Sequence, residues 1–249
     1  MIGTKEKKFA EFKVTPENAE AYAAAKDAVD GFCSGESVLP LLLTSHGQGK
    51  GKSHLLGAAE NVIAEMQPQA KVISMTGSQF IGSYIQAVRE GQYNSFECDF
   101  DSADVLIIDD AECIPDNSVA EKQFIYILGR LYMKHALIII AADISSKKAE
   151  DFVYCLDFCL KGRTVEIGMM DAEGRISLLK ECLEKEKAIR EKIFESEEMD
   201  QILELIANSS DENLATMERN LRMVIYFAEL YERTLTLEFV KEIVGDLTA

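Results

Sequence analysis

The stretch TSHGQGKGKSHLL, residues 44–56, nearly matches a phosphate-binding loop and then departs from it. The P-loop pattern is glycine, four residues, glycine, lysine and then serine or threonine; its backbone N–H groups and its lysine hold phosphates. Gly51, Lys52 and Ser53 fit this pattern, whereas His46 occupies the place of the first glycine. The sequence therefore asks whether this loop can still hold a nucleotide.

The residues around the loop favour nucleotide binding. An apolar run ends just before it, and residues 52–64 have the apolar period of a helix. A loop between a buried strand and a helix lets backbone N–H groups converge on phosphate. Lys52 is expected to reach the β and γ phosphates of ATP or ADP, and Ser53 to place its hydroxyl on Mg²⁺. The nucleotide-contacting candidates in this segment are His46, Gly47, Gly49, Lys50, Gly51, Lys52, Ser53 and His54.

The histidine at position 46 needs its own explanation. Glycine relieves the Cβ restriction where a backbone turns sharply, but histidine tolerates unusual dihedral angles better than most residues. Gly47, Gly49 and Gly51 still allow phosphate a close approach. We expect nucleotide binding to survive the change, and His54 to pack locally on the helix rather than act as a base. A glycine-rich turn without a ligand is the alternative interpretation.

A second motif, VLIIDDAE at 105–112, is an apolar strand that ends in two acids. A carboxylate at the tip of a neighbouring strand can hold magnesium through water, which we assign to Asp109. A second can orient an attacking water, which we assign to Asp110. Paired acids at a strand end could instead cap the next helix.

Five continuous apolar runs predict strands of a parallel sheet that is buried on both faces, with helices between them. The runs are residues 38–44, 71–75, 104–110, 136–142 and 164–168. After residue 168 only helical patterns follow, at 172–194, 197–208, 213–232 and 236–247. The predicted architecture is an α/β nucleotide-binding base, residues 1–168, followed by a small helical lid, residues 169–249.

Composition restricts the partners. The net charge of −17 works against general attraction to nucleic acid and favours a protein partner. No apolar run reaches the roughly 20 residues of a membrane helix, and the first residues lack a secretory signal, so we expect a cytoplasmic protein without a membrane partner. The six cysteines are interpreted as reduced thiols; Cys155 and Cys159 could share a helix face, but two thiols alone do not complete a metal site.

Taken together, the motifs resemble the AAA+ ATPase domain of the bacterial replication initiator DnaA and its shorter relatives. FKVTPENAEAYAAAKDAV (12–29) is similar to the first segment of that domain, in which an asparagine, here Asn18, lies near the adenosine. HGQGKGKSHLL (46–56), SADVLIIDDAECI (102–114) and TLEFVKEIVGDL (236–247) resemble its Walker A loop, Walker B strand and last lid helix. The resemblance implies an AAA+ fold, ATP or ADP with Mg²⁺, and head-to-tail contacts that could join copies or related subunits.

The sequence departs from this family at the residues that promote hydrolysis. Alignment on TVEIGMMDAEGR (164–175) puts Phe158 where the family has an arginine finger, and the nearby Arg163 is displaced. Loss of such a finger can lower the rate by roughly 10³ to 10⁵. We therefore expect slow hydrolysis or none.

The two sensor positions differ from one another. In the lid, the family's sensor arginine is replaced by Ala215, with Arg219 and Arg222 one and two turns further on. The sensor position after the fourth strand retains Asp143, which joins Asp110 as a catalytic candidate.

A further departure concerns DNA. The initiator binds single strands through basic residues in the segment before Walker B, whereas REGQYNSFECDFDSAD (89–104) contains Glu97, Asp99, Asp101 and Asp104 and no basic residue after Arg89. Such carboxylates would repel a phosphate backbone. The chain also stops at the lid, without the initiator's helix-turn-helix domain. We expect binding to neither single-stranded nor duplex DNA.

Three hypotheses remain open. The first is an ATP- or ADP-bound regulator or adaptor that contacts a replication protein, such as DnaA or the helicase machinery. Its closest types are the regulator that inactivates DnaA and the helicase loaders, although residues 1–9 lack a clamp-binding peptide and leave no room for a helicase-binding domain. The second is a degenerate P-loop fold that works as a nucleotide-independent interaction module. The third, a P-loop kinase, lacks a recognisable acceptor site.

Overall fold

The computed structural model describes residues 7–187, 198–209 and 213–248. The chain divides into two compact units, Met1–Gly168 and Met169–Ala249, which are described separately below.

The first unit contains the five-stranded parallel sheet that the sequence predicts. Its strands are β1 (Leu41–Ser45), β2 (Val72–Thr76), β3 (Val105–Asp109), β4 (Leu137–Asp143) and β5 (Arg163–Glu166). The strand order is β2-β3-β4-β1-β5, and every neighbouring pair is parallel. β1 begins at Leu41 rather than at residue 38, because Pro40 just before it lacks an N–H for the ladder. All carboxyl ends of the strands therefore meet at one edge.

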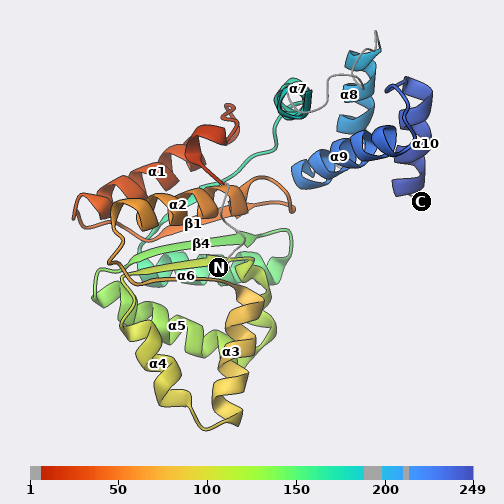
Figure 1. Ribbon diagram of the computed structural model, residues 1–249. Coiled ribbons are helices and arrows are strands. Elements are labelled where there is room, and N and C mark those ends of the chain that lie inside the picture. The colour runs from red at the N-terminus through yellow and green to blue at the C-terminus, as the bar shows by residue number, and fades with distance from the viewer. Residues whose placement is uncertain (1–6, 188–197, 210–212, 249) are drawn as a thin grey trace. The chain divides into compact units, whose positions relative to one another are not determined.

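Helices cover both faces of this sheet (Figure 1). One face carries α1 (Ala19–Cys33) and α2 (Lys52–Met66), preceded by the short 3-10 helix η1 (Phe9–Glu11). The other carries α3, α4, η2, α5 and α6, which span Gly77–Arg89, Tyr93–Asp101, Ala111–Asp116, Ser118–Met133 and Lys147–Leu160. This layered arrangement confirms the predicted α/β class.

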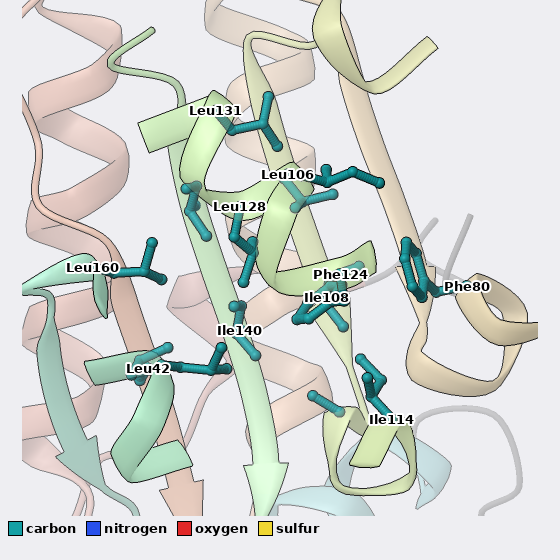
Figure 2. Packing of buried hydrophobic residues seen from close by; sticks show 14 of the residues in the cluster. Leu42, Phe80, Leu106, Ile108, Ile114, Phe124, Leu128, Leu131, Ile140 and Leu160 are labelled. Carbon is teal, nitrogen blue, oxygen red and sulfur yellow. The ribbon is translucent and has the colours of Figure 1, made fainter. Parts of the chain in front are cut away.

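Alternation along the strands gives each face its own core. Leu106 and Ile108 of β3 contribute to the core under α3 to α6, whereas Val105 and Ile107 contribute to the core under α1 and α2. In Figure 2, Phe80 and Phe124 lie beside the residues of β3 in the first of these cores, with ring centroids 5.0 Å apart. Apolar burial on both faces explains why the strands are continuous apolar runs.

The second unit consists of helices alone in its described part. These are α7 (Ala172–Lys187), α8 (Met199–Asn208), α9 (Leu214–Leu230) and α10 (Leu237–Thr248). They share an apolar core that includes Leu179, Ile206 and Val240. The last residues of the helix predicted over 172–194 lie outside the described residues. No helix in the described ranges is long and apolar enough to cross a membrane.

Candidate functional site

The backbone of residues 46–51 explains how histidine is accommodated. Gly47, Gly49 and Gly51 have φ angles of 92°, 72° and 102°, which side-chain-bearing residues rarely adopt. His46 is not among the residues with positive φ. Its side chain is exposed, and its Nε2 lies 4.0 Å from Glu166 Oε1. Histidine tolerates an unusual dihedral angle better than most residues, but the loop requires no such angle at position 46.

Lys52 lies beneath this loop at the first position of α2. The residue is only 5% exposed. Its ammonium group donates a hydrogen bond to Ser45 Oγ and another to the carbonyl of Gly47 at 3.4 Å. Ser45 Oγ in turn donates to the same carbonyl at 2.7 Å. The three residues hold the start and the end of the loop together.

Asp143, at the end of β4, also holds the loop in place through a hydrogen bond to its backbone. The N–H of Gly47 donates to Asp143 Oδ1 at 3.0 Å and to Ser145 Oγ at 2.8 Å. Both the N–H and the hydroxyl of Ser145 donate to Asp143 Oδ1. Burial alone would raise the pKa of Asp143, but these hydrogen bonds from Ser145 and Gly47 outweigh it and hold the pKa below its usual value.

Three further carboxylates stand at the same edge of the sheet. Asp109, the last residue of β3, is 2% exposed and accepts a hydrogen bond from the N–H of Asp110 at 3.0 Å. Glu112 Oε2 accepts from the N–H of Asp143 at 3.0 Å, which ties the segment after β3 to β4. Desolvation raises the pKa of Asp110, and the neighbouring charges of Asp109, Glu112 and Asp143 add to the rise. The positive charge of Lys52 opposes the rise.

The oxygen donors that we assigned to magnesium, Asp109 and Ser53, do not complete a magnesium site by themselves. Asp109 offers a carboxylate, and Ser53 is the second residue of α2, directly after Lys52. The described residues contain no group of three or more histidine, cysteine or acidic side chains that could hold a metal ion. Mg²⁺ is usually held by one or two carboxylates together with water and substrate phosphates, so this donor set suits a magnesium ion that arrives with a nucleotide.

Two predicted contact residues are occupied elsewhere. Asn18 is 1% exposed; its Oδ1 accepts from the N–H of Thr15 at 2.8 Å, and its Nδ2 donates to the carbonyl of Lys13 at 3.0 Å. His54 Nε2 donates to the carbonyl of Lys8 at 3.0 Å, and its ring lies edge-on to Phe12. Asn18 thus shapes the N-terminal turn, and His54 packs against the segment before α1.

The residues at the family's arginine positions are exposed or paired within the chain. Phe158, on α6, is 77% exposed. Arg163 makes ion pairs with Glu20 at 3.5 Å and Asp27 at 3.9 Å, both on α1 of the same chain. In the second unit, one exposed side of α9 carries Ala215, Arg219 and Arg222.

Sequence reasoning missed four residues of this site. Ser45 acts through Gly47 and Lys52 of the loop itself, whereas Glu112 and Ser145 act through contacts with distant segments. The fourth is Phe12: a Cβ built on Gly51 would lie 2.9 Å from Phe12 Cε2, so this ring packs directly on the loop. Ser45 and Glu112 adjoin the two motifs and could have been suspected; Ser145 and Phe12 carried no signal.

A parallel sheet whose first strand leads through three left-handed glycines into a helix that begins with a buried lysine defines a P-loop fold of the AAA+ type. Residues 4–162 match the family model of the bacterial DnaA ATPase domain, which covers more than half of the chain. The chain belongs to this family.

Individual relatives agree with this assignment. The chromosomal replication initiator DnaA of Cereibacter sphaeroides is 28% identical over 240 residues, which are 96% of this chain and 51% of the relative. The chain thus spans about half the length of the curated relatives it matches. Domain III of Thermotoga maritima DnaA has a similar fold, with a TM-score of 0.79, 20% identity and 97% of each chain covered. A DnaA bound to AMPPCP and single-stranded DNA matches with a TM-score of 0.70, 22% identity, and 92% and 68% of the two chains.

The loop geometry predicts that a substitution is tolerated at position 46 and is destabilising at position 51. His46→Gly should change the free energy of unfolding by at most about 1 kcal/mol, because no left-handed φ is involved. Gly51→Ala should lower it by about 1–3 kcal/mol through backbone strain, and the ring of Phe12 would have to shift as well. Urea unfolding of both variants measures the difference. Equal losses would contradict this account of the loop.

Ser145 should act through Asp143. Ser145→Ala removes a donor to Asp143 and an acceptor for the N–H of Gly47, so the pKa of Asp143 should rise and the free energy of unfolding should fall by about 0.5–1 kcal/mol. Carboxyl chemical shifts followed through a pH titration report the pKa. Ser145→Thr keeps the hydroxyl group and is the control. An unmoved pKa in the alanine variant would remove Ser145 from the site.

Proposed function

We propose that this chain binds ATP or ADP with Mg²⁺ and acts in replication as a regulator or adaptor through protein contacts. The observation that carries the proposal is the loop itself, whose left-handed glycines precede a buried Lys52 that is hydrogen-bonded to Ser45 and to the carbonyl of Gly47. Lys52 would meet the nucleotide phosphates, and Ser53 and Asp109 would hold the magnesium ion that neutralises their charge. His46, Gly49 and Lys50 belong to the same proposed binding loop.

Hydrolysis is proposed to be slow or absent. Asp110 is placed to orient a water molecule, and its raised pKa favours acceptance of a proton. Asp143 positions the loop through the N–H of Gly47. Between copies of this chain, the site would lack the cation of the arginine finger for the transition-state charge, since Phe158 stands in the finger position and Arg163 is paired with α1. The bound nucleotide would then define a state of the protein rather than supply energy.

The acids before β3 disfavour binding to DNA, for a more specific reason than their number. Asp101 and Glu97 form ion pairs with Arg130, and Asp99 lies 4.0 Å from Lys71. These pairs engage Arg130 and Lys71, while Lys134 donates hydrogen bonds to the carbonyls of Asp101 and Ala103. The carboxylates are thus partly neutralised, but no cation among these residues is left over for a phosphate backbone.

The proposed partner is another replication protein, such as a DnaA or a component of the helicase machinery. Family membership places the domain in replication initiation. A chain with a net charge of −17 suits a protein partner better than nucleic acid. AAA+ head-to-tail contacts would then join it to copies of itself or to related subunits.

Lys52→Ala tests the nucleotide site. Calorimetric titration with ATP and ADP in magnesium should show affinity about 100-fold lower or absent, and the nucleotide should no longer raise the melting temperature. Lys122→Ala, an equal charge change on the exposed face of α5, is the matched control. Phosphate release by the unaltered chain should be negligible. If the unaltered chain binds no nucleotide, the interaction-module hypothesis replaces this one.

Single-stranded oligonucleotide should show no measurable affinity for the chain at low salt. Fluorescence anisotropy at two salt concentrations is the measurement, because phosphate contacts weaken steeply with added salt. A salt-sensitive complex would overturn the charge analysis of α4. Arg130→Ala, which frees Asp101 and Glu97, should leave the result unchanged.

A further inference from the structure

Two cysteines lie on adjacent turns of α6. Cys155 and Cys159 are four residues apart, and both are exposed. Residues with this spacing have Cβ atoms about 5–6 Å apart on one side of a helix. Cys155 and Cys159 therefore lie on the same side of α6 with both side chains exposed.

This pair is distinct among the cysteines of the chain. The other four lie on separate elements: Cys33 on α1, Cys98 on α4, Cys113 on η2 and Cys182 on α7. Tyr154 and Phe158 flank the pair on the same exposed side of the helix, 73% and 77% exposed. Aromatic rings beside sulfur form favourable contacts. None of these residues takes part in the proposed nucleotide site.

We propose that Cys155 and Cys159 form a two-coordinate site for a soft metal ion, Cu(I). Thiolate ligands select soft ions of this kind. Metal–sulfur bonds of about 2.3 Å, as in zinc thiolates, place two sulfurs at most about 4.6 Å apart across one ion, a span that the helix spacing allows. Binding replaces two S–H bonds by two S–Cu bonds, releases two protons to water and transfers no electron.

Zinc and disulfide chemistry fit the pair less well. A structural zinc site takes four ligands, and no group of three candidate ligands occurs in the described ranges 7–187, 198–209 and 213–248. A disulfide needs Cβ atoms about 3.5–4.5 Å apart, closer than the roughly 5–6 Å that this helical spacing gives.

The test is a competition for Cu(I) without oxygen. The reduced full chain is titrated into the coloured Cu(I) complex of bathocuproine disulfonate, and it should withdraw one ion per chain. Cys155→Ser and Cys159→Ser should each lower the affinity at least about 10-fold, and Cys98→Ser, another exposed cysteine, should leave it unchanged. Circular dichroism verifies that each variant is folded.

A relocated pair tests the spacing itself. Asp151→Cys combined with Cys159→Ser moves the four-residue spacing one turn back along α6, to positions 151 and 155, and should restore uptake. The proposal is overturned if the unaltered chain withdraws no Cu(I), if the single serine variants withdraw as much as the unaltered chain, or if the relocated pair remains inactive.

Discussion

The buried ammonium group of Lys52 is the interaction on which the candidate site depends. A charge that is 5% exposed requires polar partners, and Ser45 Oγ and the carbonyl of Gly47 supply them. Because Ser45 ends β1 and Lys52 begins α2, the same hydrogen bonds fix the width of the loop. The hydrogen bonds of Lys52 thus set both the position of its ammonium group and the shape of the loop backbone.

Parallel strands bring the acids to this cation. β1 lies between β4 and β5, and Ser45 is in register with Asp143 of β4. Asp109 ends the next strand, β3, at the same edge. Asp109, Asp110, Glu112 and Asp143 make this edge of the sheet locally negative, so a nucleotide would be expected to enter with a divalent cation. The magnesium requirement in the proposed function follows from this balance of charge.

Sequence could predict what depends on local pattern. The five apolar runs gave the strands, since both faces of each strand are buried, and the spacing of Gly51, Lys52 and Ser53 located the loop. It could not predict bonds between distant segments, such as that from Gly47 to Ser145, because no pattern marks them. Nor could it show that the side-chain amide group of Asn18 is hydrogen-bonded to the backbone of its own turn. The acids of α4 looked like free charges because their partner Arg130 lies on another helix.

The segment before α1 extends the site beyond its motifs. Lys7 Nζ donates to the carbonyl of Ser53 at 3.1 Å, and Asn61 Nδ2 donates to the carbonyl of Lys7 at 2.8 Å. Together with Phe12 on Gly51, these contacts fasten the segment to both the loop and α2. A change in the φ angle of Gly51 would displace Phe12, and with it the stacked ring of Tyr22 on α1. The loop is therefore coupled to the outer surface of the first unit, where a partner could respond to its state.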